Sequence, residues 1–199
     1  MCHIYITHFE QPEKMKHTAE HRVGLELLSQ ALADLYHIQI APEELEHHLD
    51  KNEYGKPFLK EHPEIHFNIS HANDIAICAV DTQVIGADIE EIRDFHDAIL
   101  RKVFTDEERA FWEQIATDED SRREWFFRFW TLKESRIKHA GLGLSMSLTG
   151  FSFAFDTSVS PYKITCSDKG ICFQQEILED KYVLSVCTAN PTTLNLIYR

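Results

Sequence analysis

The sequence has no apolar run long enough to cross a membrane and few basic residues for its length. No apolar stretch approaches the roughly 20 residues of a transmembrane helix. The first residues, MCHIYITHFEQPEK, lack the basic-then-apolar order of a secretion signal, so we expect a cytoplasmic protein without membrane association. The chain has 20 Lys and Arg against 33 Asp and Glu, a formal net charge of −13 that disfavours nucleic acid as a partner. An anionic ligand therefore needs a local basic group or a metal ion.

Disulfide and zinc-binding patterns are also missing. The five cysteines are odd in number and show no CxxC spacing, which excludes a disulfide framework and a zinc site of the usual spacing. We expect reduced thiols, mostly small core residues on strands, at Cys2, Cys78, Cys166, Cys172 and Cys187. There are 12 histidines but no HExxH motif, and the pair His47-His48 is typical of a solvated helix face.

The chain is long enough, at 199 residues with 43% hydrophobic content, to bury a substantial core. Apolar residues at 25, 28, 32 and 35 predict an amphipathic helix over 18–36, and APEELEHHL predicts a shorter helix from Ala41. The alternation in IHFNIS, the turn HAND and the run DIAICAVD predict a hairpin, and VIGADIE predicts a third strand. Helices are expected over 105–116 and 122–139, followed by strands in GFSFAF, YKITC, ICFQQEIL and KYVLSVCT.

This order of elements predicts an α+β fold made of two similar halves. Each half has helix before strands, and FNISHANDIAICAV and FQQEILEDKYVLSVC resemble each other as hairpins. We expect a single chain with pseudo-two-fold symmetry, in which each half is an antiparallel sheet packed against helices. The predicted halves are residues 1–83 and 84–199, packed tightly because no linker-like segment separates them.

The strand IGADIEE carries two carboxylates on one face. Asp88 and Glu90 alternate with the apolar residues, so both side chains can converge on one ion. Mg²⁺ is the ion that such hard oxygen ligands suit. The alternative is a half-exposed strand with a wet acidic face. Gly86 favours a site, because glycine within a strand often marks close approach by a ligand or by another backbone.

The helix that contains WTLKESRIKHAGLGLS places Glu134 near its apolar stripe rather than opposite it. A charge there needs a partner, and an i to i+4 surface pair with Lys138 is the simplest one. Two shorter motifs add the parts of an anion site. NISHA supplies the hydroxyl of Ser70 and the imidazole of His71, and GKP supplies the ammonium of Lys56. Each of these motifs is weak alone.

Four motifs together resemble the successive signatures of the 4′-phosphopantetheinyl transferases. They are GKP at 55–57, FNISHA at 67–72, IGADIE at 85–90 and FWTLKESRIKHAGLGLS at 129–145. Their form is similar to the surfactin-synthetase-activating type, a single-chain pseudo-dimer expected to be a monomer. The similarity is strong over roughly 52–155 and implies an active site at the interface of the two halves.

The resemblance implies a role for each candidate residue. Asp88, Glu90 and Glu134 would bind Mg²⁺ on the pyrophosphate of coenzyme A. Lys133 and Lys138 would contact its phosphates. The nucleotide end would be held in the N-terminal half, by Lys56, Ser70 and His71.

The implied reaction transfers 4′-phosphopantetheine from coenzyme A to a serine hydroxyl of an apo acyl or peptidyl carrier protein and releases 3′,5′-ADP. Lys138 would stabilise charge at the transferred phosphorus and Lys133 charge at the pyrophosphate. Glu134 would accept the serine proton, directly or through a metal-bound water. Two alternatives remain: a carrier-binding module without chemistry, and a magnesium-dependent phosphohydrolase. No motif fixes a partner for the 3′-phosphate, for which Lys14, Lys16 and Arg22 are candidates.

Overall fold

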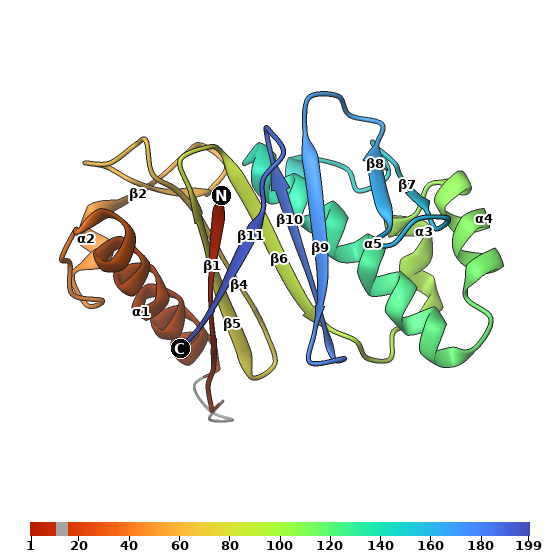
Figure 1. Cartoon of the computed structure of the whole chain (residues 1–199), viewed down its shortest axis with the longest axis horizontal. Coiled ribbons are helices and arrows are strands. Elements are labelled where there is room, and N and C mark those ends of the chain that lie inside the picture. Colours follow the sequence, from red (N-terminus) through yellow and green to blue (C-terminus); the bar gives the residue numbers. More distant parts are fainter. Residues whose placement is uncertain (11–15) are drawn as a thin grey trace.

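The computed structural model describes residues 1–10 and 16–199, and they form four layers (Figure 1). A helical layer at one end, formed by α1, covers a four-stranded sheet. A three-stranded sheet follows, and a second helical layer around α5 closes the other end. The larger helices are α1 (Lys16–Tyr36), α4 (Asp106–Ile115) and α5 (Glu119–Ala140); short ones are α2 (Leu45–His48), α3 (Leu100–Val103), η1 (Asp97–Ile99) and η2 (Gly143–Ser145).

The first sheet has the strand order β11-β1-β5-β4. Its strands are β1 (Cys2–His8), β4 (His66–Ala72), β5 (Ile75–Asp81) and β11 (Leu194–Tyr198). The β1–β11 pair is parallel and the other pairs are antiparallel. Our expectation of an antiparallel sheet in each half is therefore wrong for this pair. The last strand also joins the sheet of the first half, although it follows the predicted boundary at residue 83. In Figure 1, β1 and β11 lie side by side, and the two chain ends lie at opposite ends of this parallel pair.

The second sheet has the order β6-β10-β9 and is antiparallel throughout. Its strands are β6 (Ile85–Glu91), β9 (Cys172–Leu178) and β10 (Tyr182–Thr188). The remaining strands of the described residues form two small hairpins: β2 (Leu49–Lys51) with β3 (Pro57–Leu59), and β7 (Phe153–Asp156) with β8 (Lys163–Cys166). The α+β class and both predicted long hairpins are confirmed. The pseudo-two-fold relation of the halves stays a prediction.

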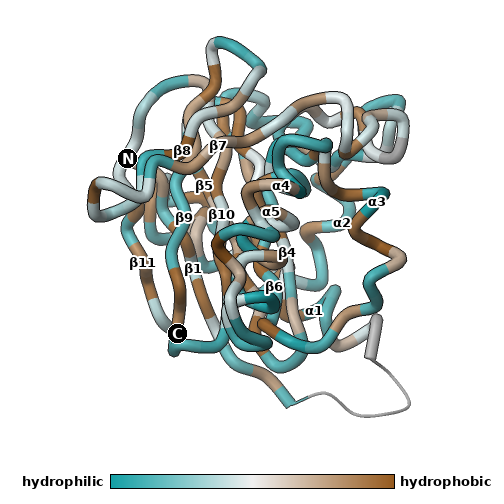
Figure 2. The backbone as a smooth tube through the Cα atoms, turned by 90° about the vertical axis from the view of Figure 1, so that its right-hand side faces the viewer, coloured by the Kyte–Doolittle hydropathy of each residue, from teal (hydrophilic) through white to brown (hydrophobic). Residues whose placement is uncertain are grey.

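Three apolar cores hold the layers together, and hydrophobic residues run along the strands in Figure 2. One core fills the space between the sheets and includes Ile4, Ile77 and Ile89. A second lies under α1. The third is mostly aromatic and packs α3, α4 and α5 on the second sheet. The alternation in β6 puts Ile89 in the first of these cores, so Asp88 and Glu90 are left for other partners.

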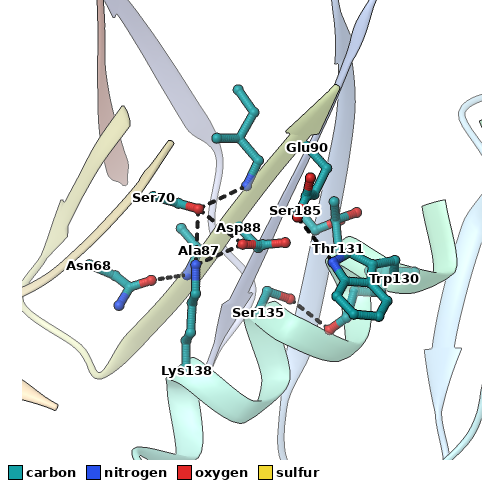
Figure 3. Close-up of polar contacts among 12 residues, drawn as sticks. Asn68, Ser70, Ala87, Asp88, Glu90, Trp130, Thr131, Ser135, Lys138 and Ser185 are labelled. Atoms are coloured by element: carbon teal, nitrogen blue, oxygen red, sulfur yellow. Dashed lines mark hydrogen bonds and ion pairs between the residues drawn. The ribbon is translucent and has the colours of Figure 1, made fainter. Parts of the chain in front are cut away.

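The two sheets meet where β4 lies beside β6. Side chains bridge these strands: the backbone N–H of Ala87 donates to Asn68 Oδ1 at 2.8 Å, and that of Ile89 donates to Ser70 Oγ at 3.3 Å. Figure 3 shows both contacts next to α5. Buried backbone donors need acceptors, and buried polar side chains supply them where the two sheets join.

Helix α5 crosses β6 at Gly86, where the two backbones nearly touch. A Cβ at Gly86 would lie 2.1 Å from the carbonyl oxygen of Ser135 and 2.2 Å from the nitrogen of His139. Gly86 therefore marks close approach by another backbone. This is one of the two explanations for a glycine within a strand, the other being close approach by a ligand. This contact fixes the face that α5 presents to Asp88.

Several smaller expectations are also resolved. All five cysteines are free and lie on strands. The second predicted helix is shorter than expected, because residues 42–44 form a turn before α2 begins at Leu45. The strands β1, β2, β3 and β11 were not predicted. Among the described residues, no helix is long and apolar enough to span a bilayer.

Candidate active site

Helix α5 is well delimited by its own sequence. Asp118 and Ser121 form a capping box at its start, and Gly141 ends it in the left-handed conformation at φ 66°. Within the helix, Glu134 and Lys138 are one turn apart and lie on the same side. The helix therefore presents a carboxylate and an ammonium together, close to the junction of the two sheets.

A pocket of about 450 Å³ opens along this side of α5. It brings together Lys56, Glu134 and Lys138, which come from two of the predicted motifs far apart in the chain. The other lining residues are mainly apolar or glycine: Tyr54, Gly55, Pro57, Asn68, Ile137, Gly141, Gly143, Met146 and Leu148. A largely apolar pocket with a few convergent charges is typical of a ligand site.

Lys138, Asp88 and Ser70 form a compact polar cluster beside this pocket (Figure 3). The Lys138 ammonium donates to Asp88 Oδ1 at 2.7 Å and to Ser70 Oγ at 2.9 Å. Ser70 donates in turn to the same Asp88 oxygen at 3.0 Å. Asp88 is only 4% exposed, and its second oxygen, Oδ2, is buried without a partner among the described residues. One carboxylate oxygen is thus oriented and the other is left for a ligand.

The carboxylates near this cluster raise one another's proton affinity. Burial raises the pKa of Glu134 to about 7, and the charges of Asp88 and Glu90 add to the effect while Lys138 opposes it. Burial also raises the pKa of Asp88, against the Lys138 ammonium that lowers it. Lys138 pairs with Asp88 and Arg93 pairs with Glu90, so these two cations do not balance the three carboxylates and a further cation is favoured at this point.

Glu90 has partners of its own beside Asp88. Arg93 donates to its Oε2 at 2.8 Å, and the indole N–H of Trp130 donates to its Oε1 at 3.2 Å. Figure 3 shows the Trp130–Glu90 pair beside Asp88. The two acidic residues of β6 therefore share a face, as predicted, but each is held by a different cation.

The residues fit a divalent cation, although they do not form a closed cage for one. Within residues 1–10 and 16–199, no three His, Cys, Asp or Glu side chains are close enough to bind a metal together. The unpartnered Oδ2 of Asp88 and the raised pKa of Glu134 nevertheless match an ion that brings most of its own ligands. Mg²⁺ behaves in this way, because it keeps waters and substrate phosphates around it.

Lys56 also lines the pocket and is partly buried. Its ammonium donates to the carbonyl oxygens of Ile85 at 2.8 Å and His139 at 3.3 Å. Burial lowers the pKa of Lys56 to about 8. The loop before it is fixed by Asn52, whose Oδ1 accepts from the backbone N–H of Tyr54 and Lys56. The side chain is therefore held in place beside the pocket and is not a free surface lysine.

His71 faces a second pocket of about 590 Å³ that shares Gly55 and Pro57 with the first. Its Nδ1 lies 3.5 Å from the buried carboxylate of Glu20. The remaining lining residues are His21, Leu25, Glu46, Leu49, Lys51, Phe67 and Ile69. Of the candidates for the 3′-phosphate, Lys14 lies outside the described residues, as does the side chain of Lys16. Arg22 pairs with Glu26 on the surface.

Lys133 does not join the site. Its side chain is fully buried on another side of α5, where the ammonium pairs with Glu108 at 2.8 Å. It also donates to the carbonyl oxygens of Leu148 at 2.7 Å and Phe151 at 2.9 Å. The expected contact with phosphates is therefore not supported, because five residues along a helix correspond to about 140° of rotation from Lys133 to Lys138.

Sequence reasoning missed three side chains that organise the site. Asn68 bridges the sheets, Trp130 donates to Glu90, and Glu108 neutralises Lys133. Asn68 lies within the FNISHA motif and could have been suspected from it. Thr105-x-x-Glu108 has the capping-box pattern that the structure shows, but nothing local indicates its pairing with α5.

The 4′-phosphopantetheinyl transferase superfamily matches this chain over residues 84–187, which include β6, α5 and β10. The chain therefore belongs to that superfamily. It is 36% identical over 141 residues to the 4′-phosphopantetheinyl transferase Sfp of Bacillus subtilis, covering 70% of this chain and 62% of that protein.

Other relatives extend the similarity beyond Bacillus. The 4′-phosphopantetheinyl transferase gsp of Aneurinibacillus migulanus is 33% identical over 73% of this chain and 60% of its own length. The L-aminoadipate-semialdehyde dehydrogenase-phosphopantetheinyl transferase of Mus musculus is 31% identical over 72% of this chain and 53% of its own length. The chain thus spans less than two thirds of each relative.

Proposed function

We propose that this chain transfers 4′-phosphopantetheine from coenzyme A to a serine hydroxyl of an apo acyl or peptidyl carrier protein, with release of 3′,5′-ADP. Membership of the superfamily supports the reaction class. The observation that carries the proposal is the meeting of Lys56, Glu134 and Lys138 in one pocket beside the buried Asp88. Two cations and two carboxylates there match a substrate that is a phosphate ester and needs a divalent ion.

Asp88, Glu90 and Glu134 would hold Mg²⁺ in this site. Bound there, the ion would supply neutralisation of the pyrophosphate and of the charge that develops on the leaving 3′,5′-ADP. The unpartnered Asp88 Oδ2 and the excess of negative charge around Glu134 support this assignment. Glu90 would have to rotate from Arg93 to take part, whereas Asp88 is already oriented by Ser70.

Lys138 would stabilise the transferred phosphoryl group. An ammonium has three N–H donors, and two of those of Lys138 are directed at Asp88 and Ser70. The third can serve a phosphate oxygen in the pocket that Lys138 lines. Such a preset donor strengthens charge stabilisation in the transition state, because it needs little reorganisation.

Glu134 would accept the proton of the attacking serine. A base works best when its pKa lies near the working pH, and in the protein without metal, burial raises the pKa of Glu134 to about 7. A bound Mg²⁺ would lower this pKa, because it favours the charged carboxylate. The proton would pass to Glu134 directly or through a metal-bound water. The nucleotide end would extend past Lys56 toward the second pocket, where His71 lies. We also propose that the chain acts as a monomer with pseudo-two-fold halves.

Intact-protein mass spectrometry of carrier proteins tests this function. A panel of apo acyl and peptidyl carriers is incubated with the protein, coenzyme A and Mg²⁺. We expect one carrier class to gain a single phosphopantetheinyl group, and a carrier whose acceptor serine is changed to alanine to gain none. Consumption of coenzyme A without a modified carrier would instead indicate a phosphohydrolase. Carrier binding without either product would indicate a binding module.

A further inference from the structure

The strongest feature outside the reacting groups is the buried ion pair between Glu108 on α4 and Lys133 on α5. Both side chains are fully buried, and the two charged atoms are 2.8 Å apart. Burying a charge is costly unless it is paired and hydrogen-bonded. The chain keeps this pair next to Glu134, so its position relative to the site needs an explanation.

The hydrogen bonds of Lys133 leave no donor for a ligand. Its three N–H groups match three acceptors: Glu108 Oε2 and the carbonyl oxygens of Leu148 and Phe151. Glu108 is equally occupied. Its Oε2 also accepts from the backbone N–H of Thr105 at 2.8 Å, and its Oε1 accepts from that of Phe153 at 2.7 Å. The pair is thus a closed hydrogen-bond network, and Lys133 has no N–H group left to donate to a phosphate.

The network anchors a segment that has little structure of its own. Residues 146–152 connect η2 to β7 without helix or strand. Their carbonyl oxygens at Leu148 and Phe151 accept from Lys133, and Phe153 donates to Glu108. Buried backbone groups need partners, and here the ion pair supplies what a sheet would otherwise provide. The same segment contributes Met146 and Leu148 to the wall of the 450 Å³ pocket.

We propose that Lys133 is a positioning residue, which acts through residues 146–152 to hold the apolar wall of the pocket against Glu134 and Lys138, and that Glu108 is its obligatory partner. The positioning role rests on the proposed function in one respect, which is that the ligand of the pocket is coenzyme A. The neighbouring residues Lys133 and Glu134 then have different roles. Glu134 lines the pocket, and Lys133 holds in place the segment 146–152 that forms another part of its wall.

Two variants test the proposal without touching the reacting groups. Lys133→Met removes the ammonium, and Glu108→Gln removes the charge of its partner on another helix at constant size. Glu107→Gln, one residue earlier on the exposed side of α4, is the matched control. Because Glu108 cannot reach a ligand in the pocket, an equal effect of the first two variants indicates positioning.

Hydrogen exchange of the free protein is the first measurement. We expect the amides of residues 147–153 to exchange at least about tenfold faster in both variants, because local opening becomes easier, while those of β10 keep their wild-type rates. The control should match the wild type. Because no substrate is present, this readout stands even if the chain has no transferase activity. Unchanged exchange in Glu108→Gln, which keeps its volume, would overturn the proposal.

Steady-state kinetics with a carrier protein is the second measurement. We expect the KM for coenzyme A to rise about tenfold in both variants while kcat stays within about threefold, since a displaced wall weakens binding but not the chemical step. A phosphate ligand would behave differently: Lys133→Met would lower kcat strongly, and Glu108→Gln would resemble the wild type. That pattern would restore the role that the sequence predicts for Lys133.

Discussion

At the scale of single residues, two lysines of one helix show how burial decides their roles. Lys133 and Lys138 stand in the same motif, and sequence similarity assigns both to phosphates. One is enclosed by Glu108 and two carbonyl oxygens. The other pairs with Asp88 at the edge of a pocket and stays 27% exposed. The phosphate role of Lys138 stays a prediction, which its place beside the pocket supports, whereas the surroundings of Lys133 depend on a partner 25 residues away.

Asp88 gives a residue-scale prediction for the site. Asp88→Asn keeps the size of the side chain and an oxygen for Ser70 and Lys138. Since burial raises the pKa of Asp88 and so disfavours its charge, we expect the melting temperature to change little. Transfer should fall by at least about a hundredfold if Asp88 binds the metal as we propose, because that carboxylate is lost. Paired thermal melts and carrier modification rates measure both effects.

Asp88→Ala is the contrasting variant. It leaves the Lys138 ammonium and the Ser70 hydroxyl without their acceptor and should cost about 1–3 kcal/mol of unfolding free energy. Wild-type transfer by a folded Asp88→Asn protein would remove Asp88 from the metal site.

Glu134 gives a prediction for pH. Its folded pKa of about 7 lies above the ordinary 4.5, so the folded protein binds the proton more tightly than the unfolded chain. The free energy of unfolding therefore decreases as pH rises from about 4.5 through 7. Glu134→Gln removes this dependence and should raise the melting temperature at about pH 8, but hardly at about pH 5, in the presence of a chelator. An equal shift at both pH values would contradict the assignment.

At the scale of elements, the sequence predicted what depends on local pattern. The hairpins β4–β5 and β9–β10, the strand β6 and the helices α1, α4 and α5 were predicted from residues that are close together in the sequence. The strands β1 and β11 were missed, because they pair with each other across 192 positions and no local signal reports such a pairing.

The candidate site divides in the same way. Motif order predicted that Lys56, Asp88, Glu134 and Lys138 meet, and they do. The orientation of Glu90 toward Arg93 and Trp130 depends on how α5 packs on β6. That packing is not visible in spacing alone, since Gly86 indicated a close approach without indicating by what.

The crossing of α5 over β6 gives an element-scale prediction. In Gly86→Ala the new Cβ would lie about 2 Å from backbone atoms of Ser135 and His139, which cannot move without shifting the helix. Overpacking of this kind typically costs about 1–3 kcal/mol, and we expect the upper end or more.

Gly24→Ala is the matched control, because its nearest atom is a side-chain methyl of Ile69, at 2.7 Å, and not a backbone atom. Thermal melts of the two variants compare them. A Gly86→Ala protein as stable as Gly24→Ala would mean that α5 does not approach β6 so closely.

At the scale of the whole molecule, the net charge of −13 limits how an anionic substrate is held. The first pocket has Lys56 and Lys138, but the second has the carboxylates of Glu20 and Glu46 beside Lys51. We therefore expect weak recognition of the 3′-phosphate and a preference of less than about a hundredfold for coenzyme A over dephospho-coenzyme A. The ratio of kcat/KM for the two substrates with one carrier measures it, and a larger preference would contradict the expectation.

Arg22→Ala tests the remaining basic candidate. Its side chain is 71% exposed and pairs with Glu26. We expect the same substrate ratio as in the wild type, since Arg22 does not line the second pocket and an exposed pair contributes little. A collapse of the ratio would show that the start of α1 binds the 3′-phosphate.

The central claim is that the pocket beside Asp88, Glu134 and Lys138 transfers phosphopantetheine, and the intact mass of a carrier protein tests it most directly. Wild-type protein, Lys138→Met and the surface control Lys169→Met are compared at equal folded concentration, with coenzyme A and Mg²⁺. The account predicts that wild type and Lys169→Met add one phosphopantetheinyl group to the acceptor serine, and that Lys138→Met adds none in the same time. Modification by Lys138→Met at the wild-type rate, or none by the wild type on any carrier, would contradict it.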